Sequence, residues 1–203
     1  MGFILLAAEL LENELAPFDH VVYEYISAYI SPVATKVMTW ISFLGSAPVL
    51  IAITALFLIT ARKKRHFRFY EAMMALNLLA AWLMNVLFKT VFHRARPDLI
   101  RLAAATGFSF PSGHSMVSAA FYGYLIYLCV LFLKRPWKEI CSALLLCVVL
   151  FIGVSRIYLG VHYASDVAAG FLAGFSWVIL FSALTNRFRE NWKPRSARIR
   201  RRE

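Results

Sequence analysis

The stretch from Ser155 to Asp166 places an arginine, a histidine and an aspartate within sequence that is otherwise apolar. Ionisable side chains at membrane depth are costly, so they usually serve a function. His162 and Asp166 are four residues apart, and on a helix this spacing predicts that they share one face. An aspartate that binds one imidazole nitrogen leaves the other free to attack an electrophile. The alternative is a buried structural pair beside an arginine that reaches a lipid headgroup.

Two further polar stretches lie upstream and favour the catalytic interpretation. The first runs from Lys89 to Pro97 at the end of one apolar run, and the second, Pro111 to His114, opens the next. Alternate passes through a membrane would bring the ends of two spans and the starts of the two that follow them to one face. The residues that we expect to converge there are Lys89, Arg96, Ser112, His114, Arg156, His162 and Asp166.

The cations in this set indicate a phosphate ligand. Lys89, Arg96 and Arg156 would repel one another around a histidine unless a dianionic group lay between them. Arginine offers a planar fork that matches phosphate oxygens, and lysine offers a point charge. Backbone N–H groups of Ser112 and Gly113 at a helix start would bind the same anion. Ser112 also fits the simpler role of a helix cap.

The two histidines suggest a division of labour in phosphoryl transfer. His162, oriented by Asp166, would attack phosphorus and become a phosphohistidine, while His114 would protonate the departing oxygen and later activate water. The cations would stabilise charge on the equatorial oxygens. No carboxylate cluster accompanies the histidines, and the cations would repel a divalent ion, so we expect no metal and no cofactor.

The composition indicates an integral membrane protein. Of the 203 residues, 61% are hydrophobic and 16% are charged, whereas soluble domains are about half apolar and about a quarter charged. Residues 17–48 predict amphipathic surface helices, and 1–16 predict an abbreviated first span or an interfacial segment. The expected fold is an all-α, polytopic helical bundle whose five assignable spans cover 49–60, 69–88, 112–133, 139–155 and 163–184.

The basic residues predict an orientation. Sixteen of the 22 Lys and Arg residues fall in the 61–68 loop, the 134–138 turn and the tail from Arg187, which the positive-inside rule assigns to the cytoplasm. The net charge of +11 therefore reflects topology and anionic lipid rather than a nucleic-acid partner. We expect a membrane-embedded domain over 1–186 and a basic cytoplasmic tail over 187–203.

The three polar stretches together resemble the signature of the type 2 phosphatidic acid phosphatase (PAP2) superfamily, which includes lipid phosphate phosphatases. That signature reads K-x6-R-P, P-S-G-H and S-R-x5-H-x3-D, and every spacing is satisfied between Lys89 and Asp166. The resemblance implies a six-helix membrane core, a histidine nucleophile and no metal. It also implies a multi-pass protein of the cell (inner) membrane whose active site faces the extracytoplasmic side.

The expected function is hydrolysis of a phosphomonoester or pyrophosphate on a membrane lipid. By resemblance, the candidate substrates are phosphatidylglycerol phosphate, phosphatidic acid and undecaprenyl pyrophosphate, among which the motifs do not choose. One alternative is a lipid phosphotransferase that uses the same phosphohistidine. Another is a non-catalytic transporter of anionic lipids, which would have little use for the paired His162 and Asp166.

Two structural expectations accompany this function. The small residues spaced four apart over 168–174 predict that the last span packs closely against the span that starts at Ser112, and a homodimer seam is the alternative use of this pattern. We also expect acyl chains to reach the site laterally, near the amphipathic 17–48 region.

Overall fold

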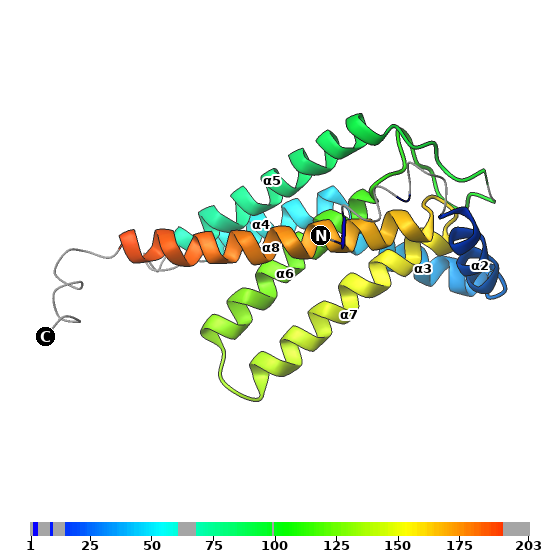
Figure 1. Cartoon of the computed structure of the whole chain (residues 1–203). Coiled ribbons are helices and arrows are strands. Elements are labelled where there is room, and N and C mark those ends of the chain that lie inside the picture. Colours follow the sequence, from blue (N-terminus) through cyan, green and yellow to red (C-terminus); the bar gives the residue numbers. More distant parts are fainter. Residues whose placement is uncertain (1, 4–8, 10–14, 61–67, 99, 193–203) are drawn as a thin grey trace, which may run out of the picture.

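The computed structural model describes residues 2–3, 9, 15–60, 68–98 and 100–192, and within them the chain is all-helical (Figure 1). The expected fold class is therefore confirmed. The named helices are α2 (Ala16–Ser27), α3 (Pro32–Leu44), α4 (Ala47–Thr60), α5 (Arg68–Phe92), α6 (Gly113–Phe132), α7 (Trp137–Tyr158) and α8 (Ala164–Trp192).

Four of these helices, α5 to α8, are long and apolar enough to cross a membrane. The span expected at 49–60 corresponds to α4, whose 14 residues extend over only about 21 Å, short of a hydrocarbon core of about 30 Å. It is long and apolar enough to cross a membrane only when it is taken together with α3, and the two helices are bent by 47° relative to each other. The described residues thus hold four spans, or five if α3 and α4 together form one broken span, and that fifth span would use part of the region expected to lie on the surface.

In the region expected to form surface helices, α2 is a short helix of 12 residues that exposes Val21 and Tyr25 and buries Asp19. The prediction for residues 1–16 lies mostly outside the described residues. At the other end of the chain, α8 continues to Trp192, so the first part of the predicted tail is helical, and 193–203 lie outside the described residues.

Small residues hold α8 against α6, as the sequence predicted. A Cβ atom at Gly170 would lie 2.9 Å from the carbonyl oxygen of Ser112, and one at Gly174 would lie 2.4 Å from that of Met116. Only glycine allows the two backbones to approach so closely. This glycine face of α8 is therefore used within the chain, and it ties the start of α8 to the start of α6.

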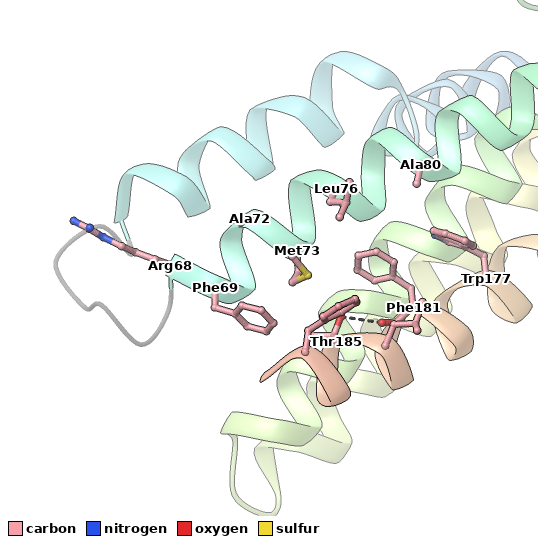
Figure 2. A pocket seen from close by; sticks show the side chains of 11 residues that line it. Arg68, Phe69, Ala72, Met73, Leu76, Ala80, Trp177, Phe181 and Thr185 are labelled. Atoms are coloured by element: carbon pink, nitrogen blue, oxygen red, sulfur yellow. Dashed lines mark hydrogen bonds between the residues drawn. The ribbon is translucent and has the colours of Figure 1, made fainter. Parts of the chain in front are cut away.

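The C-terminal ends of α5 and α7 meet the N-terminal ends of α6 and α8 at one end of the bundle (Figure 1). The Ser112 N–H donates to the carbonyl oxygen of Asp166 over 3.0 Å, which joins two of these ends directly. Near the opposite end, α5 and α8 leave an apolar cleft of about 870 Å³ beside Arg68, Trp177 and Phe181 (Figure 2). No residue of the three motifs lines that cleft, so the candidate site lies elsewhere.

Candidate active site

The third motif forms a helix end, a tight turn and a helix start. Gly160 has a positive φ of 67°, and a Cβ atom there would lie 2.3 Å from the carbonyl oxygen of Ile100. This turn places His162 after the end of α7 and before Ala164, the first residue of α8. The prediction that His162 and Asp166 share one helical face is therefore wrong, because only Asp166 is helical.

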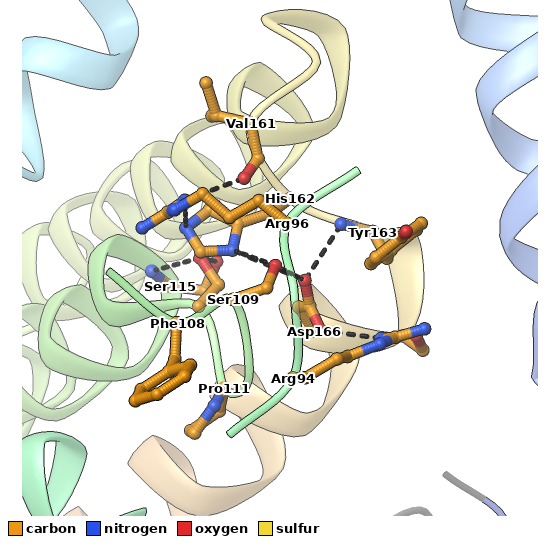
Figure 3. A network of polar contacts seen from close by, with 12 residues as sticks. Arg94, Arg96, Phe108, Ser109, Pro111, Ser115, Val161, His162, Tyr163 and Asp166 are labelled. Atoms are coloured by element: carbon orange, nitrogen blue, oxygen red, sulfur yellow. Dashed lines mark hydrogen bonds and ion pairs between the residues drawn. The ribbon is translucent and has the colours of Figure 1, made fainter. Parts of the chain in front are cut away.

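The two residues nevertheless meet (Figure 3). Nδ1 of His162 lies 3.4 Å from Oδ2 of Asp166 and 3.3 Å from Oγ of Ser109, whose hydroxyl donates to the same carboxylate oxygen. The Tyr163 N–H also donates to this oxygen over 2.9 Å, as an acidic side chain in the first turn of a helix commonly accepts from the residue before the helix. Asp166 is thus fixed by the chain itself and holds the imidazole from one side.

The other imidazole nitrogen faces an arginine. Nη1 of Arg96 lies 3.2 Å from Nε2 of His162 and donates to the Val161 carbonyl over 2.8 Å (Figure 3). Its Nε donates to the Gly107 carbonyl and its Nη2 to the Thr106 carbonyl. His162 is only 2% exposed, and this burial, partly offset by Asp166, lowers its pKa to about 4. The imidazole is therefore neutral at pH 7, and Nε2 keeps a lone pair beside a cation.

The other two expected cations also lie at this end of the bundle. Nζ of Lys89, in the last turn of α5, donates to the Phe108 carbonyl over 2.5 Å. Nη1 of Arg156 donates to Ser42 over 2.5 Å, and its buried Nε has no partner among the described residues. Lys89, Arg96 and Arg156 all interact electrostatically with His114, so the expected set does converge.

Ser112 caps α6, the simpler of its two expected roles, and its backbone N–H, which was expected to bind the anion, donates to the Asp166 carbonyl instead. Its Oγ accepts from the Ser115 N–H over 3.5 Å and from the Ser115 hydroxyl over 2.9 Å. Gly113 begins the helix, and a Cβ atom there would lie 2.9 Å from Oδ1 of Asn85. Asn85 in turn donates to the Pro111 carbonyl over 3.3 Å, so an amide side chain from α5 supports the helix start.

His114 connects the polar site to an apolar cleft. A cavity of about 560 Å³ between α4, α5 and α6 is lined by His114 and Gly113 and by apolar side chains that include Leu50, Leu79 and Trp82. Within the described part of the chain the His114 ring makes no hydrogen bond. Its ring nitrogens are therefore available to a bound molecule.

Sequence reasoning missed two charged residues of this site. Nη1 of Arg94 lies 2.7 Å from Oδ1 of Asp166, and its Nη2 lies 2.7 Å from Oδ2 of Asp19. Arg94 lies within the first motif, on the side of the membrane to which the positive-inside rule assigns few basic residues. An arginine on that side is unusual, and this signal could have identified it. Asp19 is an acidic residue on an amphipathic helix, and nothing in the sequence distinguishes it from a solvated one.

Comparison with known proteins supports the motif assignment. Phosphatidylglycerophosphatase B of Bacillus subtilis is 30% identical over 194 residues, which cover 93% of this chain and 95% of that protein. An undecaprenyl-diphosphatase of Sulfolobus acidocaldarius is 28% identical over 152 residues, 71% of this chain and 67% of the other.

A solved structure gives the same result for the fold. The crystal structure of the transmembrane PAP2 type phosphatidylglycerolphosphate phosphatase from Bacillus subtilis matches with a TM-score of 0.85 at 29% identity, covering 95% of this chain and 94% of that one. Residues 69–190, more than half of the chain and including all three motifs, match the PAP2 superfamily. This all-helical, multi-pass membrane protein therefore belongs to the PAP2 superfamily.

Proposed function

We propose that the protein is a lipid phosphatase that hydrolyses a phosphomonoester or diphosphate through a phosphohistidine at His162. One observation carries the proposal: a buried, neutral imidazole is held between Asp166 at Nδ1 and Arg96 at Nε2. An imidazole oriented by a carboxylate on one nitrogen can attack with the other. The guanidinium beside that second nitrogen supplies the charge that would hold a phosphoryl group in line.

The reaction divides into two half-reactions. In the first, Nε2 of His162 forms a bond to phosphorus while the bond from phosphorus to the lipid oxygen breaks, and His114 gives its proton to that oxygen. In the second, His114 takes a proton from water, the water oxygen attacks phosphorus, and the N–P bond breaks to release phosphate. The cations Lys89, Arg96 and Arg156 and the Gly113 N–H stabilise the equatorial oxygens throughout.

Two of the relatives act on lipids, by their names, and they suggest the substrates to test. These are phosphatidylglycerol phosphate and undecaprenyl pyrophosphate, with phosphatidic acid as a third. We expect the detergent-solubilised protein to release inorganic phosphate from at least one of them at an unchanged rate in excess EDTA. Loss of release in EDTA, restored by a divalent cation, would contradict the metal-independent mechanism. Transfer of phosphate to an added lipid acceptor in place of its release would identify a phosphotransferase.

The lipid chain is proposed to occupy the cleft between α4, α5 and α6, since His114 lines its polar end. This refines the lateral route expected near residues 17–48, because only Gly45 and Ala47, at the edge of that region, line the cleft. An apolar cleft of about 560 Å³ is of a size that commonly binds small apolar ligands.

Filling the cleft should separate long-chain from short-chain substrates. We expect Ala75→Trp to raise KM for a long-chain lipid phosphate by about tenfold, because a substrate that loses a few buried CH₂ groups loses about 1–3 kcal/mol. Hydrolysis of a soluble short-chain phosphate ester should be unchanged. Ala72→Trp is the matched control, since Ala72 lies on the same helix but lines the cleft near α8. An equal effect of Ala75→Trp on both substrates would contradict this route.

The site is further proposed to face the extracytoplasmic side of the cell membrane. Arg68, the 134–138 turn and Arg187 lie at the other end of the helices (Figure 1). The positive-inside rule assigns that end to the cytoplasm.

A further inference from the structure

Four side chains, two carboxylates, a guanidinium and an imidazole, contact one another in sequence from helix α2 to the proposed nucleophile. Asp19 binds Arg94 over 2.7 Å, Arg94 binds Oδ1 of Asp166 over 2.7 Å, and Oδ2 of Asp166 faces Nδ1 of His162 over 3.4 Å. We call Asp19, Arg94, Asp166 and His162 the charge chain (Figure 3 shows its last three members). They come from α2, the loop after α5, the first turn of α8 and the turn before it.

The two carboxylates of the charge chain are buried. Asp19 is 4% exposed and Asp166 is fully buried. Buried charges are costly unless they are paired, so Arg94 is required by both of them. The Tyr163 ring lies 4.0 Å from the guanidinium carbon of Arg94 and holds its plane from one side. Arg94 is therefore fixed by a carboxylate at each end and an aromatic face.

Asp19 also fixes the start of α8. Its Oδ1 accepts from the Ser165 N–H over 2.8 Å, and its Oδ2 accepts from the Ser165 hydroxyl over 2.7 Å. A carboxylate at the first turn of a helix satisfies an otherwise unpaired N–H group and complements the helix dipole. In this protein that carboxylate comes from another helix, 146 positions away in sequence. The orientation of the residue after Ser165, which is Asp166, thus depends on α2.

The charge chain also affects how strongly Asp166 acts on His162. Arg94 draws on the same carboxylate that serves the imidazole, and so weakens its negative potential there. Asp19 partly neutralises the positive charge of Arg94, so that Asp166 keeps more of its negative potential at the imidazole. The other groups that face His162 are Ser109, Arg96, Arg156 and His114, and none of these contacts Asp19.

We propose that Asp19 is a positioning residue for the nucleophile, acting through Arg94 and the start of α8 to hold Asp166 on His162 and to keep the imidazole basic. This inference rests on the proposed role of His162. It gives a surface helix a part in the reaction although no residue of that helix lies in the three motifs.

Two charge-removing variants should shift the pH profile in opposite directions. Asp19→Asn removes a negative charge, which disfavours the imidazolium, so the acidic limb of the kcat/KM profile should move to lower pH. Arg94→Gln removes a positive charge and should move that limb to higher pH. At these separations we expect shifts of about 0.5–1 pH unit. In Asp19→Asn, kcat should also fall several-fold with KM little changed, since the nucleophile is less basic.

The measurement uses the full-length protein in detergent and a soluble phosphate ester from about pH 2.5 to 8, so that a limb displaced below that of wild type is still recorded. Ionisation of the substrate is the same for every variant, so differences between profiles report on the protein. Glu24→Gln is the matched control, because Glu24 is an exposed carboxylate on the same helix, and it should leave the profile unchanged. The double variant of Asp19→Asn and Arg94→Gln should lie between the two single variants.

A role in folding alone would give a different result. Both variants would then lower the yield or the activity without moving the acidic limb, or would move it in the same direction, and either outcome overturns the proposal. If Arg94→Gln does not fold, Arg94→Lys is measured in its place. Because lysine keeps the positive charge, the proposal then requires that the acidic limb of the pH profile stay where it is in wild type. If His162→Ala retains activity, the proposed function fails instead, which separates the two conclusions.

Discussion

Replacing His162 with alanine is expected to abolish phosphate release, with a loss of at least about 10³-fold in kcat. The imidazole is the group proposed to form the covalent intermediate, and no other described side chain stands between Asp166 and Arg96. The measurement is twofold: steady-state phosphate release, and acid quenching with a substrate labelled at phosphorus. Wild type should yield an acid-labile phosphoprotein, and the variant should yield none.

His20→Ala is the appropriate control for this experiment. His20 is an exposed histidine on α2 that pairs with Glu24 and lies outside the three motifs, so its loss should change neither release nor trapping. Substantial turnover in His162→Ala would show that His162 is not the nucleophile. Trapping of label in that variant would assign the covalent bond to a different residue.

The second large effect is expected at Gly174, where valine should prevent normal packing of α8 on α6. The new Cβ would lie 2.4 Å from the Met116 carbonyl oxygen and 2.7 Å from Cβ of Ala119, so backbone would have to move. Overpacking typically costs about 1–3 kcal/mol, and a clash with backbone atoms should lie near the upper end of that range, at about 3 kcal/mol. For a chain of this length the thermal midpoint in detergent should fall by at least about 6 °C.

Ser176→Val provides the matched comparison, because it places the same side chain two residues away on an exposed position of the same helix. Its melting temperature should stay near that of wild type. If Gly174→Val has the same melting temperature as wild type, α6 and α8 can move apart locally without loss of stability. That result would contradict the importance assigned to the close approach of their backbones.

The motifs predicted the end of the bundle at which the site lies, because polar residues in an apolar sequence mark where spans begin and end. Lys89 falls in the last turn of α5, Gly113 starts α6, and Arg156 falls in the last turn of α7. The small-residue spacing predicted the α6–α8 contact for a similar reason, since only glycine permits it. Both inferences rest on local sequence alone.

The remaining features depend on contacts between distant residues, which local sequence does not specify. Asp19 reads as an ordinary polar position of an amphipathic helix, and its burial becomes evident only when Arg94 and Ser165 are placed beside it. Spacing suggested a shared helix for His162 and Asp166, whereas Gly160 and its fit against the Ile100 carbonyl impose a turn. Likewise, α4 is strongly apolar in sequence, and only its length and its bend against α3 show that it does not form a full span by itself.

The cleft that runs from His114 along α4, α5 and α6 has a consequence for how the enzyme handles its substrate. By the proposed route the acyl chains would pass from the bilayer into the cleft without crossing water, so the cost of about 0.8 kcal/mol for each CH₂ group withdrawn from the membrane would not arise. Only the phosphate crosses from one phase to the other, as a released ion. By the proposed route the enzyme would work in two dimensions, and its degree of saturation would follow the number of substrate molecules per unit area of membrane rather than their number per unit volume of solution.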